Sequence, residues 1–144
     1  MREILFRGKA INRGKFENYR TTYKNGDWVY GLLIKKVDKH FANLPALPAE
    51  MTNEDGISGI DVDYKTIGQY TGLTDKNGKK IFEGDIVKHD FGEEQIGVQY
   101  AVVDFSCKYA SFMISPINDW MYCDKNDCEV IGNIHDNPEL LKGE

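Results

Sequence analysis

The chain has 144 residues, of which 41% are hydrophobic, and its 18 basic and 23 acidic side chains give a formal charge of −5. A compact fold of this length buries roughly 68% of the surface that the unfolded chain exposes, so a single domain over residues 1–144 can form a core without disulfides or metal. This composition excludes collagen-like, disordered and cysteine-framework proteins.

The apolar stretches are short, as in Leu32-Leu33-Ile34, whereas a membrane-spanning helix needs roughly 18 apolar residues. Residues 1–7 do not lead into the roughly 7–15-residue apolar run of a secretory signal. We therefore expect a cytoplasmic protein that makes no membrane contact.

Charge is distributed unevenly along the chain. Residues 1–40 hold ten Lys or Arg and four acids, a balance of +6, so with −5 overall the remainder carries −11. This division predicts a basic face for a polyanion, or docking of the basic part on the acidic part within the chain or on a neighbouring copy. Ordinary solvated charge is the remaining alternative. The acidic total disfavours extensive coating of nucleic acid.

The first predicted hairpin turns at residues 24–27, because Asn25-Gly26 supplies the two positive-φ residues of a type I′ turn. Its arms are Tyr19–Tyr23 and Trp28–Lys36. The period of two places the larger apolar residues of the second arm on one face, which holds Trp28, Tyr30, Leu32 and Ile34. The opposite face holds Val29, Gly31, Leu33 and Lys35. We expect the face with Trp28 to be the core.

Residues 41–59 are predicted to form a long loop, because they lack alternation and contain two prolines. Beyond it, Asp75–Lys79 predicts a second hairpin between Tyr64–Leu73 and Lys80–Phe82, and residues 83–85 predict a tight corner that leads into a strand over Ile86–His89.

The rest of the chain also reads as short strands. Residues 96–105 are apolar on both faces, which predicts a central strand covered on both sides. Tyr109–Ile114 and Glu129–Ile134 follow as strands, with turns at residues 91–94 and 124–127. Asn137 and Pro138 predict the cap and first residue of a short C-terminal helix. The pattern indicates antiparallel strands in a sandwich or a small, partly open barrel.

Clusters of reactive side chains do not indicate a particular reaction. Cys107, Cys123 and Cys128 with His135 lack the paired spacing of a structural zinc site, so reduced thiols are expected. No catalytic, cofactor-binding or metal-ligating residue is assigned from the sequence.

Two acidic pairs support a hypothesis of a small metal-dependent hydrolase. Asp61 and Asp63, and likewise Glu83 and Asp85, place two carboxylates on one face of a strand. Such groups hold hard cations or act as acid and base. The alternatives are a solvated strand for the first pair and a turn-forming role for Asp85.

A basic and aromatic group near the N-terminus supports a nucleic-acid-binding hypothesis. Tyr19 and Tyr23 interleave with basic residues, as stacking platforms for single strands do. The side chains expected to contact phosphates in this hypothesis are Arg20, Lys24, Lys35 and Lys36.

The run Gln69–Val87, QYTGLTDKNGKKIFEGDIV, resembles the signature of the YopX-like proteins of phages and prophages. The opening at Arg2–Arg7 and the ending at Val130–Leu141 are similar to the start and end of the same family. The resemblance implies a mainly β, partly open barrel with a tendency to assemble. It brings no established reaction and no catalytic residue.

Together these observations predict a non-catalytic, phage- or prophage-encoded protein that acts by binding or self-assembly. The protein is expected to form a homo-oligomer. The charge division and the strand edges that an open barrel exposes support this expectation. An unknown phage or host protein is a further expected partner. The nucleic-acid-binding module is the alternative, and the hydrolase is the third hypothesis.

Overall fold

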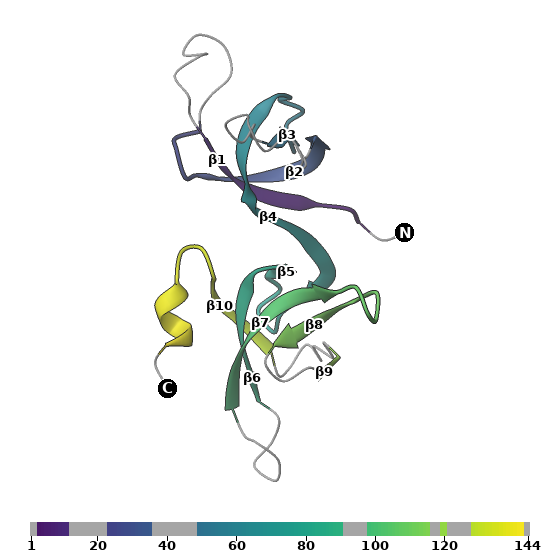
Figure 1. Ribbon diagram of the computed structural model, residues 1–144, viewed down its shortest axis with the longest axis vertical. Coiled ribbons are helices and arrows are strands. Elements are labelled where there is room, and N and C mark those ends of the chain that lie inside the picture. The colour runs from purple at the N-terminus through teal and green to yellow at the C-terminus, as the bar shows by residue number, and fades with distance from the viewer. Residues whose placement is uncertain are drawn as a thin grey trace. The chain divides into compact units, whose positions relative to one another are not determined.

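The computed structural model describes residues 3–11, 23–35, 49–90, 98–115, 119–120 and 128–142. Its elements follow one another along the chain in Figure 1: β1 (Phe6–Ala10), β2 (Trp28–Lys35), β3 (Ala49–Asn53), β4 (Ile60–Thr74), β5 (Lys80–Phe82), β6 (Asp85–Asp90), β7 (Val98–Ser106), β8 (Ser111–Ser115), β9 (Asp119–Trp120), β10 (Cys128–Asn133) and the 3-10 turn η1 (Pro138–Leu141). All strand pairings are antiparallel. The predicted mainly β fold class is confirmed.

The chain divides into two compact units, one of residues 3–69 and the other of residues 70–144 with residues 1–2. Each unit is described by itself below. The expectation of a single domain stays a prediction.

The first unit is a ring of four strands. The strands run in the order β1-β2-β3-β4, and β1 pairs in addition with β4 (Figure 1). This second pairing closes the sheet on itself, so every strand of the ring has a neighbour on both sides. The ring is the closed part of the predicted barrel.

The interior of the ring is built mainly from small and medium side chains. Its buried cluster consists of Ala10, Val29, Ala49, Met51, Ile60 and Val62. Gly8 lies opposite Val29 on β1, and a Cβ added to it would lie 3.2 Å from Val62. The interior therefore has little spare volume, as expected of a ring with only four strands.

The predicted core face of β2 is wrong. Val29 on the opposite face is fully buried, whereas Tyr30, Leu32 and Ile34 are 38%, 56% and 53% exposed. Trp28 is half-buried. The period of two correctly assigns these residues to two faces of the strand. The face with the smaller residues lies inside the ring, because the narrow interior has no room for the larger ones. The larger apolar side chains consequently point outward.

Two truncations on β2 test this assignment. Val29→Ala is expected to lower the free energy of unfolding by about 2 kcal/mol, because it opens a cavity in the ring. Leu32→Ala is expected to change the free energy of unfolding by less than about 0.5 kcal/mol, because Leu32 is exposed. Urea denaturation of both variants measures the difference. A larger loss for Leu32→Ala would show that the core lies on the other face.

A turn is present at residues 24–27, but the predicted type I′ geometry is wrong, because Gly26 and not Asn25 has a positive φ. Gly26 has a φ of +91°, and the Asp27 N–H donates to the Lys24 carbonyl oxygen at 3.0 Å. The Lys24 N–H in turn donates to the Asp27 carboxylate at 2.8 Å.

The strand paired with the start of β2 differs from the prediction. It is β1, with Lys9 opposite Trp28 and the Ala10 N–H donating to the Asp27 carbonyl oxygen at 2.8 Å. Of the predicted first arm, Tyr23 is not in a strand, and residues 19–22 lie outside the described residues. The small residues of β1 fit the ring interior, which explains why β1 takes this position.

Part of the predicted 41–59 loop is a strand. β3 alternates buried Ala49, Met51 and Asn53 with half-buried residues, and it pairs with β2 and β4. Its small and medium inward side chains again suit the ring. Residues 41–48 lie outside the described part of the chain, and residues 54–59 connect β3 to β4 without a strand.

The second unit contains a sheet in the order β10-β6-β7-β8-β9, together with β5, which pairs with the end of β4. The predicted second hairpin is confirmed, with Thr74 opposite Lys80 and Tyr70 opposite Phe82. The core of this unit consists of Ile81, Val87, Ala101, Val103, Ile114, Cys128 and Val130.

The central position predicted for the strand at residues 96–105 is confirmed, because β7 lies in the middle of the sheet order. The expectation that this strand is covered on both sides is wrong. Ala101 and Val103 are buried on one face, whereas Val98 and Tyr100 on the other face are 45% and 37% exposed. The predicted turns at residues 91–94 and 124–127 lie outside the described residues.

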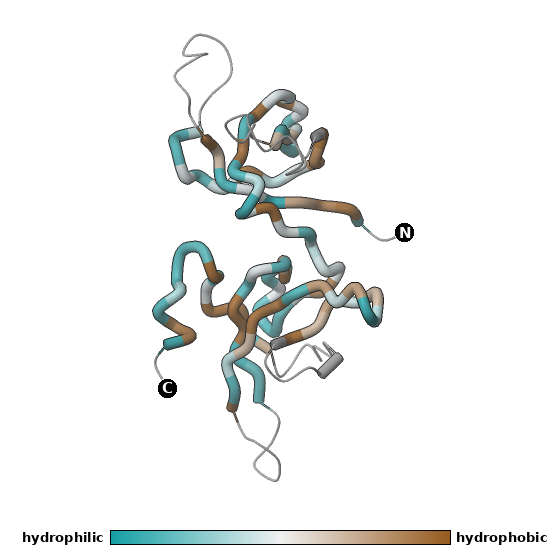
Figure 2. Tube along the Cα trace, in the orientation of Figure 1, coloured by the Kyte–Doolittle hydropathy of each residue, from teal (hydrophilic) through white to brown (hydrophobic). Residues whose placement is uncertain are grey.

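The C-terminal segment of the second unit is largely hydrophilic before η1 (Figure 2). Pro138 begins η1, as predicted, but η1 is one 3-10 turn. Asn137 makes no side-chain cap hydrogen bond to it. In the part of the chain that is described, no helix has the length and hydropathy needed to cross a membrane.

Candidate functional site

Two of the four predicted phosphate-contacting residues, Lys24 and Lys35, lie in the described part of the chain, and their role stays a prediction. Lys24 is exposed in the turn before β2, and Lys35 is the last residue of β2, with only its backbone described. Arg20 and Lys36 lie outside the described residues. Tyr23, expected to stack on bases, packs against the ring core instead. Its hydroxyl accepts a hydrogen bond from the Asn53 amide at 3.0 Å.

Two basic side chains on the outer face of the ring contact Trp28. The Arg7 guanidinium lies 4.7 Å from the centroid of the indole ring, and the Lys9 ammonium lies 5.4 Å from it. Arg7 is only 5% exposed. Cations at these distances are attracted to the negative face of the ring. Arg7 and Lys9 thus hold Trp28 in place, a role that the sequence pattern did not indicate.

An apolar row continues along β2 from this cluster. The β2 strip, defined as Tyr30, Leu32 and Ile34, is exposed along one strand face. Thr52 lies opposite Leu32 on β3, and the buried Arg7 lies opposite Tyr30 on β1. Contiguous exposed apolar side chains are a feature of protein-binding surfaces. The β2 strip is therefore a candidate contact surface of the first unit.

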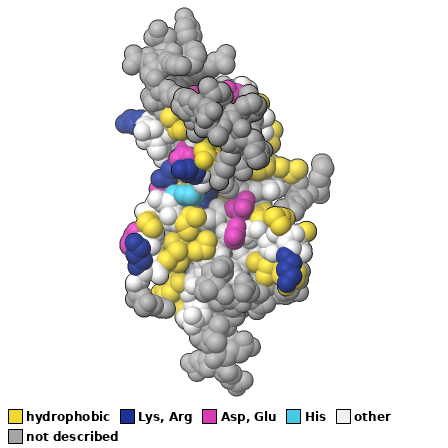
Figure 3. Space-filling view, viewed as in Figure 1, with side chains coloured by type: hydrophobic (Ala, Val, Ile, Leu, Met, Phe, Trp, Pro, Cys, Tyr) yellow, Lys and Arg dark blue, Asp and Glu magenta, His cyan; other side chains and the backbone are white. Residues whose placement is uncertain are grey.

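Hydrophobic side chains also reach the surface elsewhere. Figure 3 shows several such patches on one face of the molecule, separated by charged and polar side chains. In the second unit, the exposed apolar residues include Val98, Tyr100, Phe105 and Tyr109. Val98 and Tyr100 lie two residues apart on β7 and form a shorter row of the same kind, whereas the β2 strip extends over three side chains.

One carboxylate of each acidic pair, Asp63 and Asp85, accepts a backbone N–H group. The Asp63 carboxylate accepts the Lys65 N–H at 3.0 Å, and Asp61 lies opposite Glu50 on β3. The Asp85 carboxylate is 1% exposed and accepts the Phe82 N–H at 2.8 Å. Its place in the 83–85 corner agrees with the turn-forming alternative. Among the described residues, no three His, Cys, Asp or Glu side chains are grouped closely enough to hold a metal ion.

The thiols are separate from one another where they are described. Cys107 is exposed and Cys128 is buried in the core of the second unit, and neither forms a disulfide. Cys123 lies outside the described residues.

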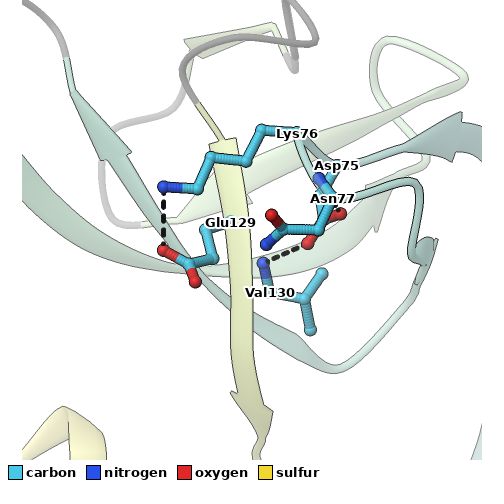
Figure 4. Close-up of polar contacts among 5 residues, drawn as sticks. All are labelled: Asp75, Lys76, Asn77, Glu129 and Val130. Carbon is cyan, nitrogen blue, oxygen red and sulfur yellow. Dashed lines mark hydrogen bonds and ion pairs between the residues drawn. The ribbon is translucent and has the colours of Figure 1, made fainter.

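One buried polar side chain in the signature run, Asp75, makes three backbone contacts and is 3% exposed. Its Oδ1 accepts the N–H groups of Asn77 and Lys79, each at 2.9 Å, and closes the hairpin turn. Its Oδ2 accepts the N–H of Val130 on β10 at 2.9 Å (Figure 4). One carboxylate therefore holds its own turn and a strand 55 residues further along the chain.

The pKa of Asp75 lies below its ordinary value. Burial by itself raises the pKa of this carboxyl group, but the N–H groups of Val130, Lys79 and Asn77 and the charge of Lys79 together outweigh burial. The carboxylate is thus the form that the fold prefers. The sequence indicated a turn here and gave no sign of the contact with Val130.

Beside this contact, the turn makes two further interactions with β10. The Lys76 N–H donates to the Cys128 carbonyl oxygen at 3.0 Å. The Lys76 ammonium also pairs with the Glu129 carboxylate at 3.1 Å, as Figure 4 shows. The turn within the signature run is consequently bound to β10 by backbone and side-chain contacts. These contacts give the run a structural role.

The architecture defines an antiparallel β protein with a closed ring of strands in its first unit. It is similar to the crystal structure of protein EF1440 from Enterococcus faecalis, with a TM-score of 0.53 and 23% sequence identity over 98% of this chain and 99% of that chain. At this identity the likeness shows the fold alone. None of the curated proteins matches the chain.

The family follows from a second comparison. The model of the YopX protein family matches residues 16–142, and the chain therefore belongs to this family. This confirms the resemblance carried by the signature run at Gln69–Val87.

Proposed function

We propose that this YopX-family chain is a phage- or prophage-encoded protein that acts without catalysis, by binding further copies of itself in the cytoplasm of a bacterial host. The β2 strip is the observation that supports the proposal most directly. Its three apolar side chains are exposed on a strand whose other face forms the core of the ring. A second copy that covered the strip would remove this apolar surface from water.

Strand edges, on which the expectation of assembly partly rested, are short in the first unit. Each strand of the ring has a neighbour on both sides over part of its length, with β2 pairing to β1 over Trp28–Gly31 and to β3 over Gly31–Lys35. The outer strand faces remain available. Association of the first unit is accordingly expected through side chains.

The charge division supports a second copy as the occupant of the strip. Residues 1–40 carry +6 in a chain of −5, so a contact between copies can place basic residues near acidic ones. Such charges favour encounter and orientation, while the apolar strip supplies the buried area.

Light scattering on a matched pair of variants tests the proposal. The wild-type protein is expected to be an oligomer at about 50 mM salt, and its mass should fall at about 500 mM because the Debye length shortens several-fold. Leu32→Lys is expected to shift the protein toward monomer at both salt concentrations, since it places a charge in the centre of the contact.

Leu73→Lys is the control, because Leu73 is exposed outside the strip, and this variant should retain the wild-type mass. A wild-type monomer at both salt concentrations would refute self-association. An oligomer that Leu32→Lys leaves intact would move the contact away from β2.

The nucleic-acid alternative rests on Lys24, which is exposed at the turn before β2. A mobility-shift titration distinguishes this alternative, because phosphate contacts weaken steeply as salt rises. Binding to a single-stranded oligonucleotide that Lys24→Glu reduces would favour it over self-association.

A further inference from the structure

The second unit ends its sheet with β10, which pairs with β6 and is the first strand in the order β10-β6-β7-β8-β9. A strand at the end of a sheet presents alternate N–H and C=O groups to an incoming chain and can serve as a template for it. Another strand can pair with β10 only if the outward N–H and C=O groups of β10 are available for hydrogen bonds.

Two outward groups of β10 are occupied by the Asp75 turn. In an antiparallel pair, residues alternate between directing their backbone groups toward the partner strand and away from it. Cys128 and Val130 share one direction, and the Cys128 carbonyl accepts the Lys76 N–H while the Val130 N–H donates to the Asp75 carboxylate. The turn thus supplies the hydrogen bonds that a further strand would make.

The next part of the edge is covered by Asn137. After the register shift between Val130 and Gly132, the Asn133 N–H donates to the Asn137 side-chain oxygen at 3.3 Å. A Cβ added at Gly132 would lie 2.6 Å from the same oxygen, so glycine allows the amide to lie against the strand. The Ile134 N–H points the other way, to the β6 side, where it donates to the Gly84 carbonyl oxygen at 2.9 Å.

We propose that the Asp75 turn and the Asn137 side chain seal the outer edge of β10 against strand addition by a second copy of this chain. The side chains take the place of a neighbouring strand without continuing the sheet. The Lys76–Glu129 ion pair adds charge at the same edge, and charged side chains at sheet edges oppose strand pairing. This inference is independent of the proposed self-association through β2.

The experiment uses the full chain carrying Leu32→Lys, so that contacts through the β2 strip do not contribute. Adding Asp75→Ala is expected to leave a folded protein with a β-type circular dichroism spectrum. It should also give about a tenfold rise in high-mass species and in thioflavin fluorescence at high protein concentration, because the Val130 N–H becomes available.

A second substitution separates edge pairing from loss of stability. Val130→Pro removes the N–H that faces away from β6, and proline is tolerated at such positions on edge strands. Adding Val130→Pro to Asp75→Ala is expected to suppress the high-mass species, although the doubly substituted protein is less stable. Aggregation caused only by destabilisation would instead increase.

Asn137→Ala is the second probe, and it is expected to raise association to a smaller extent, since it frees only the Asn133 N–H. If Asp75→Ala prevents folding, this variant alone decides the test. Folded variants with the mass of the parent protein would overturn the proposal. High-mass species that persist with Val130→Pro would overturn it as well.

Discussion

Replacing Asp75 by alanine is expected to lower the free energy of unfolding by about 3 kcal/mol, because three backbone N–H groups lose a charged acceptor. The Val130 N–H is the most costly of the three, since that bond is buried. Chemical denaturation followed by circular dichroism measures the loss. Asp104→Ala is the matched control: the Asp104 carboxylate accepts only the adjacent Phe105 N–H at an exposed position, so a change below about 0.5 kcal/mol is expected.

The contribution of Asp75 should depend on pH in a defined direction. A carboxyl group whose pKa is lower in the folded than in the unfolded state stabilises the fold above the unfolded pKa, and this stabilisation is lost as pH falls through the folded pKa. The ordinary value is 3.8, and the pKa of Asp75 lies below it. The full contribution is therefore expected at neutral pH, with a decline on acidification below the ordinary value.

Asp75→Asn provides the comparison, since it keeps the shape of the side chain and removes its charge. The difference in unfolding free energy between the wild-type protein and Asp75→Asn should be largest at about pH 7 and smaller near pH 3. An equal difference at the two pH values would show that the ionised carboxylate is not the stabilising species.

Gly31→Ala is expected to disrupt the ring, with a loss of more than about 3 kcal/mol or failure of the first unit to fold. A Cβ at this position would lie 1.8 Å from the Thr52 carbonyl oxygen and 2.9 Å from the Asn53 Cα. Both are backbone atoms of β3, so no side-chain movement relieves the overlap. Gly31 also lies opposite Phe6 on β1, which prevents β2 from shifting away freely.

The control for Gly31→Ala is Gly56→Ala. Gly56 has a φ of +83° and open space around it, so the expected loss is about 1 kcal/mol from backbone strain alone. Circular dichroism and urea denaturation of both variants provide the measurement. A Gly31→Ala protein as stable as Gly56→Ala would contradict the close approach of β2 and β3.

Turns were predictable from the sequence because the groups that form them are close along the chain. The Gly78 N–H donates to the Asp75 carbonyl oxygen at 3.0 Å, within the predicted hairpin turn. Gly84 has a φ of +84° at the predicted corner. The positive φ that glycine allows at these positions is a local property, which the type of residue determines.

The side of a strand that faces the core was not predictable in the same way. On β2 the larger apolar residues favoured one face, whereas the narrow ring accepted Val29 on the other. β3 was not predicted, because Ala49 and Met51 form no recognisable strand pattern in the sequence. They are buried only because the other strands of the ring surround them. Asn137 resembled a helix cap, yet its side chain accepts from the Asn133 N–H on β10.

The sequence by itself therefore determined the antiparallel β class, the positions of the turns and the family to which the signature run belongs. The tertiary structure decided the closure of the ring by β1 and β4, the exposure of the β2 strip and the contact of Asp75 with Val130. The physical reason is the range of the interactions. Backbone preferences act within a few residues, whereas strand register, inward faces and edge contacts depend on partners tens of residues away.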